Sequence, residues 1–194
     1  MQWPRIQIRD IADNQMVRQL WSFFPAVYGA TLISYRHISP FHQILTNIKY
    51  QGHTELAVKL GRWGANEFAS TDLPAWTDVV VPVPLSRWKA LRRGYNQARL
   101  IAQGIAQEYQ RPVADWLKRK GGSKSTQTHL TAEERLENVR NVFSARIPEK
   151  CRGKHILLVD DVMTTGATLT ACALAILRED PTASLSVFTI ALSR

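Results

Sequence analysis

Residues 156–168 read Ile-Leu-Leu-Val-Asp-Asp-Val-Met-Thr-Thr-Gly-Ala-Thr, and this stretch decides the fold. Its first four residues are apolar and predict a short buried strand. Two adjacent carboxylates, Asp160 and Asp161, follow, and the small residues 164–168 open an apolar helix over 169–177. Neighbouring carboxylates at a strand end can accept hydrogen bonds from two vicinal hydroxyls. Backbone N–H groups at a helix start can bind a phosphate, so this arrangement suits a ribose 5-phosphate.

Strand and helix patterns alternate along the rest of the chain. Strands are predicted over residues 28–35, 78–84, 113–117, 142–145 and 184–192. Helices are predicted over residues 15–24, 41–49, 55–68, with Thr54 as a cap, 96–109 and 131–139. This alternation predicts an α/β fold with a parallel-centred sheet flanked by helices, and ligands at the carboxyl ends of its strands.

Length and composition bound the class of protein. A chain of 194 residues suits one α/β domain with a small N-terminal addition. No apolar run approaches a membrane span and the N-terminus is too polar for a signal peptide, so we expect a cytoplasmic protein without membrane contact. Cys151 and Cys172 are far apart, and the five histidines form no ligand pattern. The net charge of +9 suits either an anionic ligand or nucleic acid.

A basic stretch follows the strand predicted at 78–84. Its cations are expected in a loop just beyond the strand end, where arginine can contact phosphate through two hydrogen bonds. Such a loop could hold a pyrophosphate, and an ordinary solvated loop is the alternative. The cations are Arg87, Lys89, Arg92 and Arg93.

A second basic stretch covers residues 117–131. The pair Gly121-Gly122 and the neighbouring serines predict mobility, and the lysines and arginine predict contact with an anion. A mobile basic loop can close over a phosphorylated ligand and exclude water, and a disordered surface loop is the alternative. Its cations are Lys118, Arg119, Lys120 and Lys124.

Two resemblances follow from these motifs. Residues 156–168 resemble the loop of type I phosphoribosyltransferases that binds phosphoribosyl pyrophosphate (PRPP). The order of Ile-Lys-Tyr-Gln-Gly at 48–52, Val-Pro-Val-Pro at 81–84 and Arg-Gly-Tyr-Asn-Gln-Ala at 93–98, followed by that loop, resembles the ComF (ComFC/GntX) family from about residue 28 onward. Many ComF proteins carry an N-terminal four-cysteine zinc module, whereas residues 1–27 hold no cysteine.

The resemblance implies a type I phosphoribosyltransferase fold in one structural domain, with residues 1–75 as a hood packed on a core of residues 76–194. It implies that Asp160 and Asp161 bind the ribose hydroxyls and Mg²⁺, directly or through water or ligand hydroxyls, and favour a cationic transition state. The 5-phosphate would lie against Thr164, Thr165, Gly166, Ala167 and Thr168. The pyrophosphate would contact Arg87, Lys89, Arg92 and Arg93, and Lys118, Arg119 and Lys124 would belong to the flexible loop.

Three functions stay open at this point. The first is transfer of phosphoribosyl from PRPP to an unknown base or amine, which would place the protein in nucleotide metabolism. The second is a competence or DNA-uptake accessory that binds single-stranded DNA or competence proteins, with Trp88, Tyr95 and Trp116 available for base stacking. The third is a non-catalytic sensor of PRPP or a nucleotide. Association of two copies of the chain is also left open.

Overall fold

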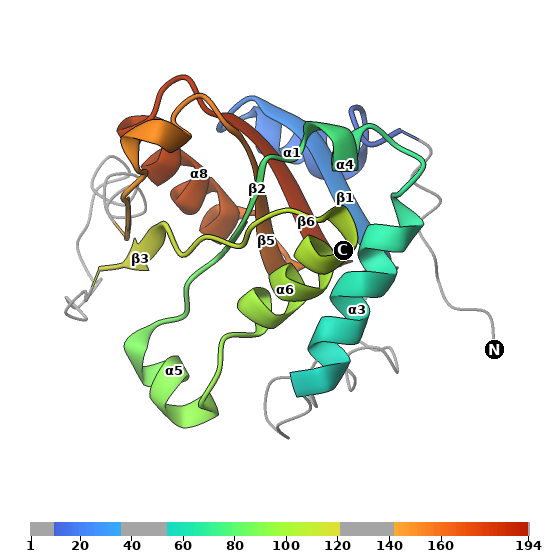
Figure 1. The fold of residues 1–194 in the computed structure, drawn as a ribbon, viewed down its shortest axis with the longest axis horizontal. Coiled ribbons are helices and arrows are strands. Elements are labelled where there is room, and N and C mark those ends of the chain that lie inside the picture. Colours follow the sequence, from blue (N-terminus) through green and yellow to red (C-terminus); the bar gives the residue numbers. More distant parts are fainter. Residues whose placement is uncertain (1–9, 36–53, 121–141, 194) are drawn as a thin grey trace.

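Four parallel strands form the main sheet of the protein. The computed structural model describes residues 10–35, 54–120 and 142–193. The sheet has the order β1-β6-β5-β2 (Figure 1). Its strands are β1 (Ala26–Tyr35), β2 (Val79–Pro82), β5 (His155–Met163) and β6 (Ser184–Ser193). The parallel-centred α/β fold predicted from the sequence is therefore confirmed.

Helices cover both faces of this sheet, as the continuous apolar runs of its strands require. Figure 1 shows α3 (Thr54–Glu67) and α6 (Gln97–Tyr109) in front of the sheet and α8 (Ala167–Glu179) behind it. Val159 and Phe188 belong to the core under α3 and α6, whereas Leu158 and Val187 belong to the core under α8 and α1 (Gln15–Trp21). Successive residues of one strand thus pack into different cores.

None of the helices in the described residues combines the length and apolarity needed to cross a lipid bilayer. The helices predicted at 41–49 and 131–139 lie outside the described residues. Thr54 is the first residue of α3 and not its cap. A short helix, α4 (Leu73–Trp76), precedes β2, and a 3-10 turn, η1 (Glu149–Cys151), precedes β5.

A small second sheet packs beside α8. It consists of β3 (Leu117–Arg119) and β4 (Phe143–Ala145), which pair antiparallel with Arg119 opposite Phe143. The strand predicted at 113–117 is wrong in its position, because Val113 makes only an isolated bridge to Val80 and the regular strand begins at Leu117.

The basic stretch predicted as a loop after β2 is a helix, α5 (Arg87–Arg93), and this corrects the prediction. Local chemistry explains the helix. The Ser86 hydroxyl accepts a hydrogen bond from the backbone N–H of Lys89, which caps the first turn. Gly94 ends the helix with φ +75°, a conformation that glycine adopts without strain. The residues between these two caps favour helix.

The N-terminal segment is part of the main sheet, because β1 pairs with β6 along its length. The segment also covers the outer edge of β1. The N–H of Gly29 donates to the carbonyl of Ile11, and the amide of Asn14 donates to the carbonyl of Gly29. Asn14 caps α1 as well, since its side-chain oxygen accepts from the N–H groups of Met16 and Val17. The segment predicted as a hood therefore supplies one edge strand of the sheet.

Helices α3 and α6 cross at glycines. A Cβ atom added to Gly61 would lie 2.1 Å from the backbone oxygen of Ile101, and one added to Gly104 would lie 2.2 Å from the backbone oxygen of Val58. Backbone cannot move aside as a flexible side chain can. The distance between the two helices therefore depends on glycine at both positions.

We expect Gly104→Ala to lower the free energy of unfolding by at least about 2 kcal/mol, because the added methyl group would overpack the crossing. In an open helix the same change would stabilise by about 1 kcal/mol, so the sign of the effect is diagnostic. Urea denaturation measures it. Gln107→Ala, at an exposed position of the same helix, is the control and should change stability little. A Gly104→Ala protein as stable as the wild type would contradict the close crossing.

Candidate active site

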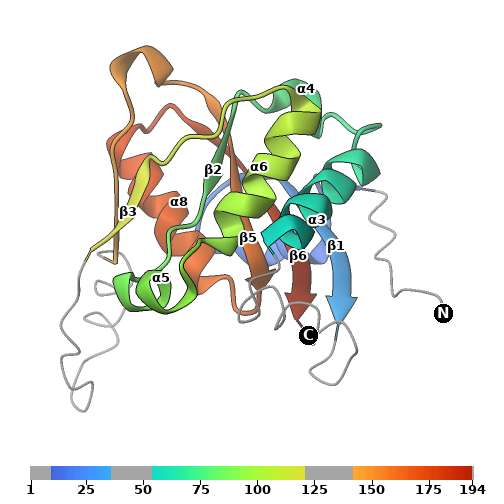
Figure 2. The same ribbon diagram turned by 60° about the horizontal axis from the view of Figure 1, so that its bottom comes forward.

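The site predicted from the sequence lies at the carboxyl ends of β2 and β5. Because these strands are neighbours and parallel, the segments that follow them leave the sheet at the same edge. Figure 2 shows α5 at this edge, the one toward which β1 and β6 point. The edge therefore brings together the Asp160–Thr168 run and the basic helix.

The two aspartates lie inside β5 and not after it. The strand continues to Met163 because Asp160, Val162 and Met163 remain in register with β6. Neighbouring side chains of a strand point to opposite faces, so the two carboxylates approach a common ligand from different sides of the strand end. The Asp160 carboxylate accepts a hydrogen bond from the N–H of Asp161 at 2.8 Å. Both residues are half-buried.

At the turn after β5, the start of α8 has one side-chain contact: the Thr165 hydroxyl accepts a hydrogen bond from the N–H of Ala167 at 3.4 Å. Gly166 occupies the cap position with φ +77°, and it has no side chain to accept a hydrogen bond. The first regular helical bond runs from the N–H of Thr170 to the carbonyl of Gly166 at 2.8 Å. Thr164, Thr165 and Thr168 are exposed around the turn. A helix start with available N–H groups and a positive dipole end binds anions.

Helix α1 supports this turn from the N-terminal segment. The side-chain amide of Gln19 donates to the carbonyl of Thr164 at 3.2 Å. A Cβ atom added to Gly166 would lie 3.1 Å from the Met163 Cε atom and 3.3 Å from the Leu20 Cδ2 atom, so the turn rests closely on α1 and β5. Sequence reasoning missed Gln19, and no local signal could have found it, because its partner is 145 residues away.

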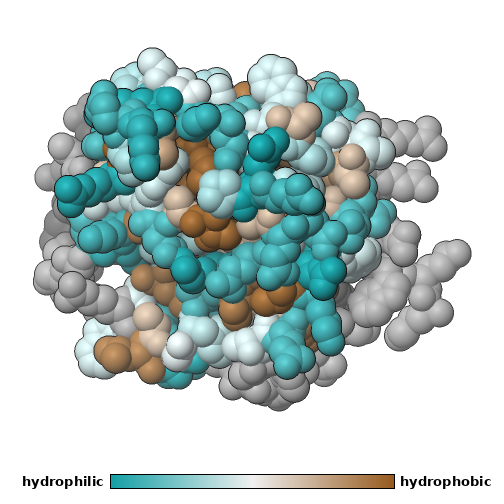
Figure 3. All heavy atoms as spheres, in the orientation of Figure 1, coloured by the Kyte–Doolittle hydropathy of each residue, from teal (hydrophilic) through white to brown (hydrophobic). Residues whose placement is uncertain are grey.

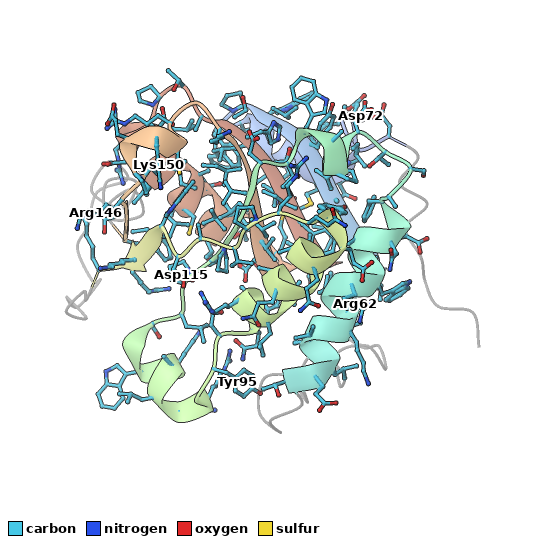
Figure 4. The ribbon with its side chains drawn as sticks, in the orientation of Figure 1. Arg62, Asp72, Tyr95, Asp115, Arg146 and Lys150 are labelled. Atoms are coloured by element: carbon cyan, nitrogen blue, oxygen red, sulfur yellow. The ribbon has the colours of Figure 1, made fainter. Side chains whose placement is uncertain are left out.

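Residues 94–98 join α5 to α6 and fix their position beyond β2. Asn96 accepts from the N–H of Ala98 and so caps α6, while its amide donates to the carbonyl of Val83 at 3.0 Å. Gly94 provides the reversal between the helices. In Figure 4, Tyr95 lies at this junction of α5 and α6. The Arg-Gly-Tyr-Asn-Gln segment thus has a structural role in placing the basic helix.

Helix α5 separates the cations predicted for pyrophosphate. At about 100° per residue, positions 89, 92 and 93 fall on one side of the helix and position 87 on the other. Leu91 and Trp88, which are 81% and 84% exposed, fall between position 87 and that side, with Trp88 next to Arg92. A pocket of about 510 Å³ lies against the helix, lined by Trp88, Lys89, Leu91, Arg92 and Arg93. Figure 3 shows a hydrophobic area over α5, one of several on this mainly hydrophilic face.

The cations predicted for the flexible loop are only partly described. Lys118 and Arg119 are exposed on β3, and the Arg119 guanidinium lies 5.3 Å from the centre of the Phe143 ring. Lys124 lies outside the described residues. Trp116 is half-buried against the core that contains α8. Trp88 is therefore much more exposed than Tyr95 or Trp116.

Cys172 lies on α8 behind the site and is fully buried. Burial, and then the nearby charge of Asp160, raise the pKa of its thiol well above the ordinary value. The thiol therefore stays protonated and takes no part as a nucleophile.

We expect Gly166→Ala to destabilise the protein by more than about 1–2 kcal/mol, since the left-handed backbone is unfavourable for alanine and the methyl group would press on Met163 and Leu20. Gly94→Ala is the matched control. Gly94 has nearly the same φ but no atom within 4 Å of an added Cβ atom. The difference between the two unfolding free energies measures the contact of the turn with α1 and β5. An equal loss of unfolding free energy in the two variants would show that backbone strain alone destabilises Gly166→Ala.

Comparison with known proteins places this geometry in a family. A family model described as the phosphoribosyl transferase domain matches residues 91–192. Among solved structures, adenine phosphoribosyltransferase from Leishmania tarentolae aligns with a TM-score of 0.43 and 12% identity, over 72% of this chain and 71% of that chain.

Three curated relatives carry names connected with competence or DNA. The DNA utilization protein YhgH of Salmonella typhi is 34% identical, over 72% of this chain and 62% of that protein. Competence protein ComFC of Bacillus subtilis is 30% identical, over 80% and 61%. Competence protein F of Haemophilus influenzae is 29% identical, over 69% and 60%. The chain thus spans about three fifths of the length of these relatives. The ComF resemblance is confirmed, and the chain belongs to the phosphoribosyl transferase domain family.

Proposed function

We propose that this protein binds PRPP together with Mg²⁺ at the carboxyl end of β5 and transfers its phosphoribosyl group to a base or an amine. One observation carries the proposal: β5, which carries Asp160 and Asp161 near its carboxyl end, leads through a left-handed glycine at the cap position into the 13-residue helix α8. Carboxylates for sugar hydroxyls and N–H groups for a phosphate therefore occur within one strand–turn–helix unit.

Different residues of this unit contact different parts of PRPP. The 5-phosphate lies at the start of α8, where the exposed residues Thr164, Thr165, Ala167 and Thr168 surround the buried Gly166. The ribose hydroxyls donate to the carboxylates of Asp160 and Asp161. The pyrophosphate faces the side of α5 that carries Lys89, Arg92 and Arg93.

The chemistry follows from this placement. A nitrogen of the acceptor attacks ribose C1, the bond from C1 to the pyrophosphate oxygen breaks, and the pyrophosphate leaves with the bonding electrons. Positive charge develops on the ribose ring as that bond breaks. Two carboxylates beside the ring favour this charge more in the transition state than in the ground state, and this difference lowers the barrier.

The donor set suits Mg²⁺ that enters with the substrate. In the part of the chain that the structure describes, no three histidine, cysteine or acidic residues converge to hold a metal. Mg²⁺ is commonly held by one or two carboxylates, phosphate oxygens and water, which Asp160, Asp161 and PRPP could provide. When bound, the ion would neutralise charge on the departing pyrophosphate.

We expect wild-type protein to bind PRPP in the presence of Mg²⁺, and Asp160→Asn and Asp161→Asn each to weaken that binding by at least about tenfold. A hydrogen bond to a charged group contributes roughly 1.5–3 kcal/mol, which accounts for this loss. Isothermal calorimetry measures the affinities. Asp72→Asn, an exposed carboxylate at α4 near the other edge of the sheet, is the control and should bind as the wild type does.

Release of pyrophosphate, assayed over a panel of bases and amines, then identifies the acceptor. If the protein binds PRPP but releases pyrophosphate with none of the acceptors, the protein would be a PRPP sensor and not a transferase. Unchanged affinity in the folded double variant Asp160→Asn, Asp161→Asn would remove the site assignment.

A second candidate function, contact with single-stranded DNA, is favoured by one specific observation. Trp88 presents an almost fully exposed indole beside Lys89 and Arg92 on α5. An exposed aromatic ring next to cations is the arrangement that stacks on a base and holds the adjoining phosphates. The names of the competence and DNA-utilization relatives agree with it.

We expect fluorescent single-stranded DNA to bind with an affinity that falls with salt by a slope of about −0.7 for each phosphate contacted. Trp88→Ala should weaken binding by at least about fivefold, because stacking contributes roughly 1–3 kcal/mol for each base. Trp76→Ala is the control, since Trp76 is 54% exposed but lies before β2, away from the carboxyl edge. Competition by PRPP would show a shared surface, and no binding at about 50 mM salt would remove direct contact with DNA.

A further inference from the structure

A row of polar residues crosses an otherwise apolar face of the main sheet. Thr31 on β1 pairs with Thr189 on β6, and Thr189 pairs with Asp160 on β5. Residues paired across neighbouring strands direct their side chains to the same face. The preceding residues on this face, such as Leu158 and Val187, belong to the apolar core under α8 and α1. Two buried threonines thus continue the row that ends in the candidate catalytic carboxylate.

The Thr189 hydroxyl has no hydrogen-bond partner among the described residues, although the residue is 0% exposed. An unpaired buried hydroxyl destabilises a fold, whereas valine has nearly the same shape and would leave no polar atom unpaired. Packing alone therefore favours valine at this position. This hydroxyl destabilises the core and lies in the same row as Asp160. It therefore indicates that Thr189 makes a hydrogen bond in another state of the molecule, such as the ligand-bound state.

We propose that Thr189 is a positioning residue, whose hydroxyl donates a hydrogen bond to the Asp160 carboxylate when that carboxylate binds the ribose hydroxyls. This inference rests on the proposed function. Without ligand, the Asp160 carboxylate accepts from the neighbouring N–H of Asp161. Neighbouring strands lie about 4.8 Å apart, so the Thr189 hydroxyl can reach a turned Asp160 carboxylate directly or through one water molecule.

A second threonine in the same row provides an internal comparison for Thr189. The other threonine of the row, Thr31, is separated from Asp160 by the whole of β6, and its hydroxyl lies 3.5 Å from the carbonyl of Ile33. Thr31 therefore shares the residue type, the burial and the row with Thr189, but not the contact with Asp160.

The test compares three variants of the full chain by PRPP calorimetry with Mg²⁺ and by thermal unfolding. Thr189→Val should weaken PRPP binding by about tenfold, as expected for loss of one hydrogen bond to a charged group. Its melting temperature should equal or exceed that of the wild type. Thr189→Ser keeps the hydroxyl and should restore affinity to within about threefold of the wild type, while Thr31→Val should leave affinity unchanged.

PRPP affinity and melting temperature together distinguish a positioning role of Thr189 from a purely structural role. A purely structural role would lower the melting temperature and leave the affinity of the folded protein intact, and it would overturn the inference. Thr189→Val binding PRPP as the wild type does would also overturn it and leave the proposed function standing. Wild-type protein that binds no PRPP would remove the proposed function, and this inference with it.

Discussion

Pairing of β5 on both sides, with β2 at one edge and β6 at the other, is the constraint on which the rest of the structure depends. The parallel register brings the ends of β2 and β5 to one edge, and so places α5 beside the turn that opens α8. A shift of one residue would turn Asp160 and Asp161 to each other's faces and expose apolar side chains. The chemistry of the site is therefore fixed by the same hydrogen bonds that hold the sheet together.

The two faces of the sheet are held in different ways. On one face, glycines let α3 and α6 approach until backbone meets backbone, and the packing there leaves no space for adjustment. On the other face, α8 and α1 pack around larger apolar side chains. Buried hydroxyls without a partner among the described residues occur on both faces, since Tyr109 belongs to the core under α3 and α6 and Thr189 lies in the row of Asp160.

Sequence reasoning located the elements that hydrophobic pattern specifies well. The strand at 184–192 and the helix at 96–109 were predicted to within one residue at each end, because long apolar patterns are local. The helix α5 was missed because a run of charges obscured ordinary caps at Ser86 and Gly94. The extension of β5 through Asp160 and Asp161 could not be predicted either, since pairing with β6 decides it.

The candidate site shows the same division. Asp160, Asp161 and Gly166 could be found because they lie close together in a single motif, and Gly166 adopts a positive φ in the structure. Gln19 and Thr189 could not be found, because each acts on residues that only the fold brings near. Motifs identify groups that contact a ligand, whereas the groups that hold them in place come from distant strands and helices.

The pairing of β1 with β6 also bears on how the protein is made. β1 lies near the beginning of the chain, and β6, the strand with which it pairs among the described residues, lies near the end. During synthesis, the apolar strand β1 therefore leaves the ribosome early. It cannot pair with β6 until almost all of the chain has been made. Contacts between such distant segments fold slowly and expose the waiting strand to aggregation. The hydrogen bonds that Ile11 and Asn14 make to Gly29 give this strand a local partner while it waits.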